Sequence, residues 1–462
     1  MPASPDAYRK SLDKAREHSL EWLASVPSRP VAPRVGITEI AKSFSFPLPD
    51  KPTDPAEVVD ELARISEPGL MAMPSGRFFG WVIGGTLPAA LAADWMVSAW
   101  DQNAGMRYAT PAAAAAEEAA AVWILDLLGL PATCGVGFTT GGTMANFVGI
   151  AAGRKHVLDR MGWDLHRDGL SGSPRITVLA GEDRHLAVDF ALRYLGLGAP
   201  VTVAVDDQGR IVPSALAEAL DQVDGPCIVC LQAGNLHSGA FDPMRECIEL
   251  AHGHGAWVHV DGAFGLWAAV SPLLSDPLAG FEHADSWATD AHKTLNTPYD
   301  CGIAIVADPQ LLRDAFGAHT SYLIQDDQGP ADPFERVPEM SRRARGVPVW
   351  AALRSLGRWG VIELVENLAL NARTLAEGLS RIPGAHIVND VVFTQVCVSF
   401  GADDLTRRVI RNLIDDGQVW MSGSRWRGQD VLRISVSNWS TDATDVEQSI
   451  AAVTRAVERA RS

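Results

Sequence analysis

Short, mainly apolar runs alternate with helical patterns through the middle of the chain. Each run has four to six residues, and together they lie at 176–180, 201–205, 227–232, 257–260, 286–289 and 302–306. Strands that are apolar along their whole length are buried on both faces, as in a mostly parallel sheet covered by helices. The pattern therefore predicts an α/β unit.

The C-terminal quarter of the chain has a different pattern. We expect three helices and two strands there, at 350–382, 403–416, 443–460, 391–400 and 432–436. This mixture indicates a small α+β domain. We assign it to residues 349–462, after a large α/β domain over residues 86–348.

The first 85 residues have no strand pattern. Residues 7–24 and 55–66 have helical spacing and flank a proline-rich stretch. Two helices joined by an extended segment cannot bury a core of their own, so we expect residues 1–85 to form an arm that packs on a second subunit.

A second long segment, 317–348, contains four prolines and has neither a helical nor a strand pattern. It predicts a long mobile loop, and loops of this length are often functional.

The chain has 462 residues, a hydrophobic fraction of 47% and a formal net charge of −17. This length predicts two or three domains with ample apolar material for their cores. The acidic balance argues against a nucleic-acid-binding protein, because binding to phosphates needs a basic surface. No stretch of roughly 18 uncharged apolar residues predicts a membrane span, and the first ten residues lack the apolar core of a signal peptide.

The six cysteines are scattered, and Cys227 and Cys230 form a Cys-x-x-Cys within an apolar run. A second pair of cysteines or histidines at zinc-like spacing is missing, so we interpret both as buried strand residues and expect no metal site. Reduced thiols favour a cytoplasmic protein.

A carboxylate and an amine stand at the ends of two predicted strands. Asp261 follows Trp-Val-His-Val, and Lys293 lies 32 residues later in Thr-Asp-Ala-His-Lys. Ligands bind at the carboxyl ends of strands in an open α/β sheet. Pyridoxal 5′-phosphate needs such a pair, because a lysine forms a Schiff base with its aldehyde and an acid keeps its pyridine nitrogen protonated. Taken singly, Asp261 is also compatible with a helix N-cap and Lys293 with a surface charge.

A glycine-rich turn and two histidines add to this pair. Gly141, Gly142 and Thr143 open a predicted helix, so their N–H groups can face a phosphate, although a simple strand-to-helix turn explains them equally well. His185 lies at another strand-to-helix junction, where its ring can stack on a cofactor or merely begin a helix. His292 precedes Lys293 and can contact the cofactor or substrate, or be an ordinary core histidine.

In these residues the chain resembles the group II pyridoxal-phosphate-dependent decarboxylases, which include the aromatic L-amino acid and glutamate decarboxylases. The most specific match is Asp-Ala-His-Lys-Thr-Leu-Asn-Thr-Pro-Tyr-Asp-Cys-Gly at 290–302. Gly-Ala-Phe-Asp-Pro at 239–243 and His-Val-Asp-Gly-Ala at 259–263 support it. The resemblance implies fold type I, with a seven-stranded mixed sheet in the large domain, a small C-terminal domain and an N-terminal segment wrapped around a dimer partner.

The resemblance also implies roles for individual residues. Lys293 would be the Schiff-base lysine, Asp261 the partner of the pyridinium, and His185 a ring stacked on the cofactor opposite Ala263. The cofactor phosphate would be contacted or approached by Gly142, Thr143, Asp290 and His292. By the same resemblance, the active site would lie at the interface of a homodimer and would take an amino acid as substrate.

Two positions depart from the family pattern. Many members have Gly-Thr-Thr before Gly-Ala-Phe-Asp, whereas this chain has Gly-Asn-Leu at 234–236, and we expect Asn235 to replace a threonine hydroxyl near the cofactor. Many members also carry a loop tyrosine that protonates the substrate carbon after CO2 leaves. Pro333 or Phe334 matches that position here, and Tyr322 is the only tyrosine nearby.

These observations lead to the hypothesis of a pyridoxal-phosphate-dependent L-amino acid decarboxylase that releases CO2 through a quinonoid. Without the loop tyrosine, another group such as His185 or Tyr322 would protonate the carbanion, or oxygen would react with it to give an aldehyde. A decarboxylating aldehyde synthase or a carbon–carbon lyase is therefore the first alternative. A catalytically silent dimeric binding protein is the second.

The substrate stays open at this stage. Arg433 can meet a carboxylate or close a domain interface, and Trp426 and Trp439 are equally undecided. Five aromatic residues can line a pocket or belong to the core, namely Phe78, Phe79, Trp81, Trp95 and Trp100.

Overall fold

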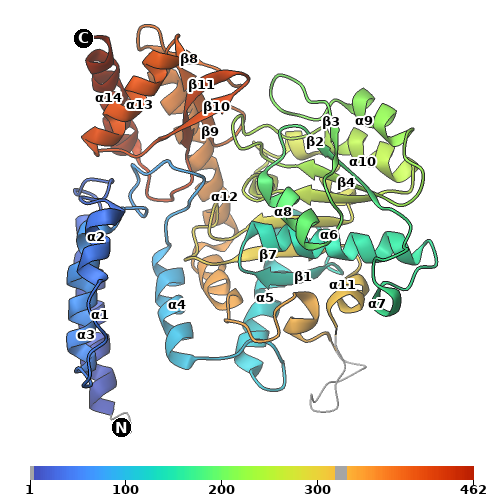
Figure 1. Ribbon diagram of the computed structural model, residues 1–462, viewed down its shortest axis with the longest axis horizontal. Coiled ribbons are helices and arrows are strands. Elements are labelled where there is room, and N and C mark those ends of the chain that lie inside the picture. The colour runs from blue at the N-terminus through green and yellow to red at the C-terminus, as the bar shows by residue number, and fades with distance from the viewer. Residues whose placement is uncertain (1–4, 318–329) are drawn as a thin grey trace.

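The computed structural model describes residues 5–317 and 330–462, and a seven-stranded sheet forms the centre of its larger part (Figure 1). The strands are β1 (Gly135–Thr139), β2 (Thr177–Gly181), β3 (Val201–Val203), β4 (Cys227–Gln232), β5 (Trp257–Asp261), β6 (Ser286–Asp290) and β7 (Gly302–Val306). Their order in the sheet is β1-β7-β6-β5-β4-β2-β3. β7 runs antiparallel to β1 and β6, and the other neighbours are parallel. The predicted mixed, mostly parallel sheet is confirmed.

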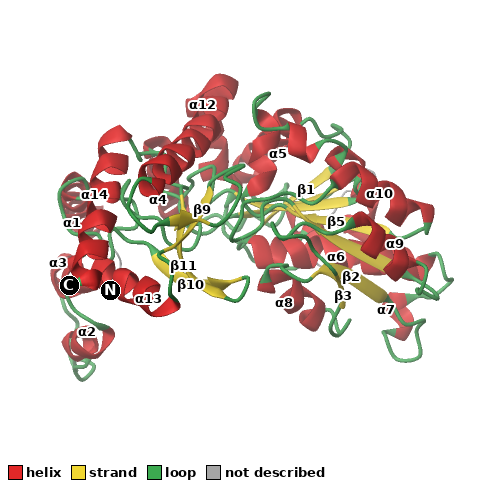
Figure 2. Ribbon diagram, turned by 90° about the horizontal axis from the view of Figure 1, so that it is seen from above, coloured by secondary structure: helices red, strands yellow, loops and turns green. Residues whose placement is uncertain are grey.

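Helices cover both faces of this sheet (Figure 2). One face packs against α5 (Pro111–Leu128), α9 (Pro213–Leu220), α10 (Met244–Gly253) and part of α12 (Gly346–Ser380). The other face packs against α6 (Gly142–Asp159), α8 (Leu186–Tyr194) and α11 (Pro309–Phe316). Successive residues of β4 alternate between the two cores, with Val229 in the first and Ile228 in the second. Burial on both faces explains why these strands are apolar throughout.

A second sheet forms the small C-terminal part, in the order β10-β11-β9-β8 with all neighbours antiparallel. Its strands are β8 (His386–Ile387), β9 (Gln395–Ser399), β10 (Ser422–Trp426) and β11 (Gln429–Ser435), and α13 (Asp403–Asp416) and α14 (Ala443–Arg461) pack on it. The predicted α+β character of this region is confirmed. α12 belongs to both parts, because its Val349 lies in the core of the large sheet and its Leu375 in that of the small one.

The N-terminal helices stand to one side of the rest of the chain (Figure 1). α1 (Pro5–Ser25) and α3 (Pro55–Ser66) pack side by side, and α2 (Ile37–Phe44) lies between them in the sequence. α4 (Pro88–Trp100) then begins the large part, and the short α7 (Leu165–Asp168) follows α6. The sequence predicted α1 and α3, but it missed α2, which lies in the stretch that we interpreted as extended.

The segment after α3 joins the small sheet rather than the arm. The Phe79 N–H donates to the Trp420 carbonyl at 2.8 Å, and the Phe79 carbonyl accepts from the Ser435 N–H at 3.0 Å. Phe79 itself is fully buried in the core of the small part.

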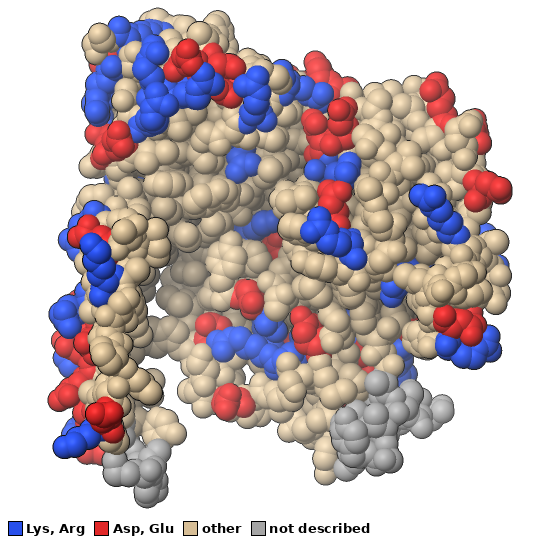
Figure 3. Space-filling model, in the orientation of Figure 1, with Lys and Arg blue, Asp and Glu red and all other residues tan. Residues whose placement is uncertain are grey.

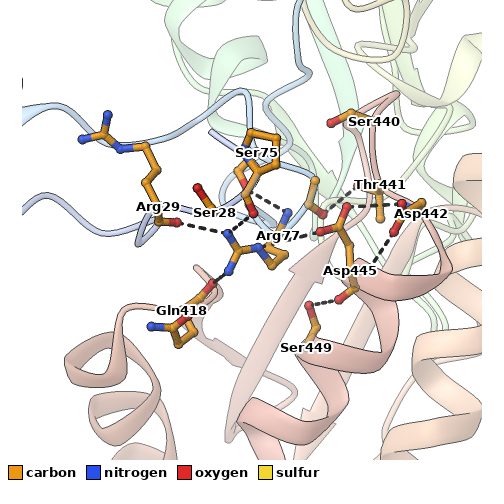
Figure 4. Close-up of polar contacts among 12 residues, drawn as sticks. Ser28, Arg29, Ser75, Arg77, Gln418, Ser440, Thr441, Asp442, Asp445 and Ser449 are labelled. Carbon is orange, nitrogen blue, oxygen red and sulfur yellow. Dashed lines mark hydrogen bonds and ion pairs between the residues drawn. The ribbon is translucent and has the colours of Figure 1, made fainter. Parts of the chain in front are cut away.

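Arg77 connects the same segment to the loop after α1, to the loop before β10 and to α14 (Figure 4). Its guanidinium donates to the carbonyls of Gln418, Pro27 and Arg29 at 2.9–3.0 Å, and its Nε lies 3.7 Å from Asp445 Oδ1 at the start of α14.

The structure differs from the sequence pattern in two segments, residues 135–139 and residues 330–348. β1 was not predicted as a strand, because Gly135 and Gly137 interrupt its apolar pattern. A Cβ at Gly137 would lie 2.7 Å from Val337 Cγ1, so the close packing of the neighbouring segment explains the glycine. Of the loop predicted over 317–348, the described part from residue 330 packs against the large domain, and its last residues belong to α12. In this part, a 3-10 helix (Pro333–Arg336) is buried, and the Arg342 guanidinium donates to the Phe138 carbonyl and to Glu117 at 2.8 Å.

Candidate active site

The predicted carboxylate and amine lie at one edge of the large sheet. Asp261 is the last residue of β5, and Asp290 is the last residue of its parallel neighbour β6. Lys293 follows three residues later, in the turn that leads into β7. Because parallel strands end at the same edge of a sheet, the chain brings these three side chains to one place.

Lys293 and Asp290 form an ion pair. Nζ of Lys293 lies 2.8 Å from Oδ2 of Asp290, whose side chain is 1% exposed. Asp290 Oδ1 has no hydrogen-bond partner within the described residues. The lysine amine is therefore oriented by one oxygen of a carboxylate whose other oxygen stays available.

The glycine-rich turn lies against this pair. Gly141 is the N-cap of α6, with φ at +150°, which an L side chain rarely adopts. A Cβ on Gly142 would lie 2.8 Å from Asp290 Oδ2, and a Cβ on Gly141 would lie 3.2 Å from His292 Cε1. Gly141, Gly142 and Thr143 thus form the N-terminus of an 18-residue helix without bulky side chains at its first two positions. The free N–H groups and the dipole of this helix favour binding of an anion.

His292 is fixed from two sides. Its Nδ1 accepts the N–H of Cys301 at 3.0 Å, and its ring stacks on Tyr299 with 4.2 Å between the centroids. Burial lowers the pKa of His292. In the neutral ring the proton is therefore on Nε2, which lies 3.7 Å from Asp290 Oδ1.

Asp261 is a buried carboxylate with one oxygen left open. Oδ1 accepts the N–H of Ala263 at 3.2 Å, and Oδ2 has no partner. Burial raises the pKa of Asp261, while the nearby His185 and Lys293 pull it down. A buried acceptor without a partner costs roughly 1–3 kcal/mol. A pyridine N–H would satisfy Oδ2, so this residue, the amine and the helix N-terminus fit pyridoxal phosphate.

His185 is the N-cap of α8, and its Nδ1 accepts the N–H of Ala187 at 3.2 Å. His185 is partly exposed to solvent. The surrounding protein nevertheless desolvates its ring, and this lowers the pKa of His185. Its charged neighbours are Asp261, Lys293, Asp290 and Arg433. His185 therefore lies with the other predicted residues, and its exposed side is free for a ring.

Asn235 uses its amide differently from the expectation. Its Oδ1 accepts the N–H groups of His237 and Ser238, and its Nδ2 donates to the Asp183 carbonyl at 3.3 Å. These contacts shape a loop. Ala263 is half-buried, and its carbonyl accepts the N–H of Asp290 at 2.9 Å, which ties the ends of β5 and β6 together.

The undecided aromatic residues separate into two groups. Phe78 and Phe79 are buried, whereas Trp81, Trp95 and Trp100 are exposed. Trp426 is buried, with its Nε1 donating to Asp183 Oδ2 at 3.3 Å, and Trp439 is exposed. Tyr322 lies outside the described residues. Pro333 and Phe334, which match the loop tyrosine of the resemblance, are both buried.

Three residues near the site were missed or left undecided from the sequence. Arg433 on β11 is buried with its Nε unpartnered, and burial lowers its pKa. Asn146 stands four residues after Gly142 on the same helix, and His259 stands two residues before Asp261 on the same strand. Residues four apart on a helix share a face, as do residues two apart on a strand, so Asn146 lies on the face of Gly142 and His259 on the face of Asp261. This spacing could have identified both residues from the sequence.

Within residues 5–317 and 330–462, no helix has the length and apolarity that a bilayer crossing needs. The same residues contain no group of three or more histidine, cysteine or acidic side chains arranged around a metal position.

Comparisons with known proteins agree with this geometry. The family model described as pyridoxal-dependent decarboxylase conserved domain matches residues 39–400. Tryptophan decarboxylase 1 of Oryza sativa subsp. japonica is 28% identical over 476 residues, covering 95% of this chain and 91% of that protein. The acidic amino acid decarboxylase GADL1 of Bos taurus is 28% identical over 331 residues. This match covers 70% of this chain but spans only 63% of that relative.

Solved structures share the fold. The crystal structure of Oryza sativa TDC with PLP and tryptamine has a TM-score of 0.92 at 24% identity, covering 99% of both chains. That of mouse CSAD has a TM-score of 0.90 at 20% identity, covering 98% of this chain and 99% of that one. The fold expected from the resemblance is thereby confirmed.

Proposed function

Because the chain belongs to the pyridoxal-dependent decarboxylase family, we propose that it is an L-amino acid α-decarboxylase with pyridoxal 5′-phosphate as its cofactor. One observation carries the proposal. A lysine amine, a buried carboxylate with an open oxygen and the N-terminus of a long helix meet at one edge of the sheet. These groups match the aldehyde, the pyridine nitrogen and the phosphate of the cofactor.

Bound pyridoxal phosphate supplies an aldehyde for the substrate amine and a ring that accepts the electrons left behind by CO2. We assign the other functions to side chains of this chain. Lys293 would hold the cofactor covalently, and Asp290 orients its amine. Asp261 would accept the pyridine N–H on Oδ2, and the N–H groups of Gly141–Thr143 would hold the phosphate, with His292 beside it.

His185 has the position of a general acid or a stacking ring. Asp261 and Lys293 are among its charged neighbours, and its lowered pKa favours the neutral ring, which would take up a proton before it could return one to the substrate carbon. The Asn235 amide is hydrogen-bonded to its own loop through Oδ1 and to the Asp183 carbonyl through Nδ2, so a cofactor contact from this residue would have to replace one of these bonds.

The proposal is tested by loading the purified chain with pyridoxal phosphate and measuring CO2 and amine release from a panel of L-amino acids. The wild type should show the visible absorbance of bound cofactor and release CO2. Lys293→Ala should lose the band and at least about 10³-fold in rate, the scale expected when a covalent catalytic group is removed. Lys155→Ala, on α6 away from the site, is the control. A wild type that never binds the cofactor would overturn the proposal.

One observation favours a second candidate, a decarboxylating aldehyde synthase. The residues matched to the protonating tyrosine, Pro333 and Phe334, cannot donate a proton, and both are buried. A carbanion that is not protonated can react with oxygen. Aldehyde, ammonia and peroxide in place of amine, with oxygen uptake, would identify this outcome.

We further propose that the chain forms a homodimer with the active site at the subunit interface. α1 and α3 leave large apolar side chains open to solvent, including Tyr8, Leu12, Leu20, Val58 and Leu62. An open groove of about 810 Å³ runs between these helices and Trp95 of α4, and Figure 3 shows the hollow beside the arm. An exposed apolar surface of this kind is typical of a subunit contact.

The division into an arm (1–85), a large domain (86–348) and a small domain (349–462) is retained as part of the proposal. Within the arm, the segment around Phe79 pairs with the small sheet. The cytoplasmic location stays a prediction, supported by six cysteines that are all free and buried.

A further inference from the structure

A chain of buried polar side chains runs beneath Asp261. It consists of Trp257 and His259 on β5, Ser286 on β6 and Asn146 on α6. His259, Ser286 and Asn146 are completely buried, and Trp257 is nearly so. Polar groups at such depth are costly unless each is hydrogen-bonded, so their arrangement needs a reason beyond packing.

The donor and acceptor types of these side chains set the direction of each hydrogen bond. The Trp257 indole N–H donates to Ser286 Oγ at 3.0 Å, and Ser286 Oγ lies 2.8 Å from His259 Nδ1. His259 Nε2 lies 2.7 Å from Asn146 Oδ1. Desolvation lowers the pKa of His259 to about 3, so its ring carries one proton.

That single proton must be on Nε2, because Asn146 Oδ1 can only accept. Nδ1 then accepts the hydroxyl proton of Ser286. The carbonyl oxygen of Asn146 is thereby committed to His259, and its NH2 group has to point the other way.

The amide end of this chain lies near the carboxylate of Asp261. Asn146 Nδ2 and Asp261 Oδ2 are two buried polar atoms without a partner within the described residues. The proximity of Asn146 lowers the pKa of Asp261, against the larger effect of burial. The amide NH2 is thus a donor near the oxygen that would accept the pyridine N–H.

The packing of α6 is built around the same residues. A Cβ at Gly149 would lie 2.6 Å from the His259 ring, and a Cβ at Gly153 would lie 2.6 Å from Trp257 Cδ1. Two glycines one helical turn apart therefore let α6 approach the sheet closely enough for Asn146 to reach His259.

We propose that Asn146 is a positioning residue for Asp261: the chain Trp257–Ser286–His259 fixes its amide so that the NH2 group donates to the Asp261 carboxylate and aligns it with the cofactor ring. The inference rests on the proposed role of Asp261. α6 then acts at both ends of the cofactor, with Gly141–Thr143 at the phosphate and Asn146 at the ring.

The test compares the affinity for pyridoxal phosphate and the visible spectrum of the bound cofactor as a function of pH. Asn146→Asp keeps the shape and still accepts from His259, but it replaces the NH2 group by a second carboxylate oxygen. Its dissociation constant for pyridoxal phosphate should rise at least about tenfold, and the pH midpoint of the visible band should shift. Asn146→Leu should weaken binding by a similar factor.

His259→Phe leaves Asn146 in place but frees its amide to rotate. We expect a smaller loss of affinity, about threefold, with the same direction of spectral shift. This variant tests the chain even where substitutions at Asn146 impair folding.

Asn389→Leu is the matched control. Asn389 is a buried amide that precedes β9, with its Nδ2 donating to the carbonyls of Gln395 in the small part and Ser238 in the large part and its Oδ1 accepting from the Cys397 N–H. It should lower the melting temperature without changing the affinity or the spectrum. Wild-type affinity and spectrum in Asn146→Asp would overturn the inference, and so would losses that follow the melting temperature equally in all variants. Failure of the wild type to bind the cofactor would instead overturn the proposed function.

Discussion

Asp261 and Asp290 are the last residues of neighbouring strands, but their carboxylates have different charged partners. Asp290 is already paired with Lys293 at 2.8 Å, so its charge is partly balanced within the chain. Asp261 receives one backbone N–H and has an open oxygen. Because an unbalanced buried carboxylate is unfavourable, we expect a ring with an N–H to bind at Asp261, whereas the charge of Asp290 is already balanced by Lys293.

The acid stability of the protein should depend on His259. Its pKa is about 3 in the folded chain and about 6.5 when unfolded, so below pH 6.5 the unfolded chain binds a proton that the folded chain does not. Stability is therefore lost as the pH falls from 6.5 towards 3. By pH 5 the loss due to this residue should be about 2 kcal/mol.

Urea unfolding at pH 7 and pH 5 checks this prediction. The free energy of unfolding of His259→Leu should fall by about 2 kcal/mol less than that of the wild type between the two pH values. His283→Leu, at an exposed histidine, serves as the control. Equal losses in the wild type and His259→Leu would contradict the assignment.

At the scale of elements, α6 and the segment around Arg77 connect parts that are far apart in the sequence. α6 begins at the glycine-rich turn Gly141–Thr143 and carries Asn146 and the two glycines, Gly149 and Gly153, that allow its close approach to the sheet. The Arg77 segment ties the loop after α1 to the small sheet and to α14 (Figure 4).

Arg77→Met should destabilise the protein by about 3 kcal/mol, since it leaves three carbonyls and the partly buried Asp445 without their partner. Burial already raises the pKa of Asp445, which adds to the cost of losing the guanidinium. Denaturant unfolding measures the change. Arg167→Met, which removes an exposed pair with Asp168, should cost less than about 1 kcal/mol. Similar values for the two variants would show that the Arg77 cluster adds little.

The sequence predicted elements best where burial is uniform. The bounds of β4 agree with the predicted run because both faces of that strand are covered. β1 was not predicted because Gly135 and Gly137 interrupt its apolar pattern. Both are glycines because α11 and the segment around Val337 pack closely against them, and the periodicity of the sequence gives no sign of these contacts. α2 was missed because the prolines around it masked an eight-residue helix.

At the scale of the whole molecule, the exposed apolar side chains of the arm and the groove beside it are the surface through which we expect two chains to associate. If the chain is a homodimer through this surface, Leu20→Glu with Leu62→Glu should shift the molecular mass in solution from two chains to one, because charges in an apolar contact are costly. Sedimentation equilibrium or light scattering measures the shift. Activity should fall with it, as the proposed site lies at the interface.

Lys10→Glu with Arg64→Glu is the matched control on the same two helices, at exposed and already charged positions. It should leave the mass unchanged. A wild type that is monomeric at micromolar concentration would contradict the dimer.

By itself the sequence determined the α/β class and the positions of the central strands to within one or two residues, and it predicted the pair Asp261 and Lys293, because these follow from local periodicity and from residue types whose chemistry is specific. Only the tertiary structure decided which of the two carboxylates pairs with Lys293, that the amide of Asn235 is hydrogen-bonded to its own loop and to Asp183, and that Asn146 and His259 lie under Asp261. Hydrogen-bond direction and partner choice depend on distances between segments up to 113 residues apart. No pattern along the chain encodes those distances.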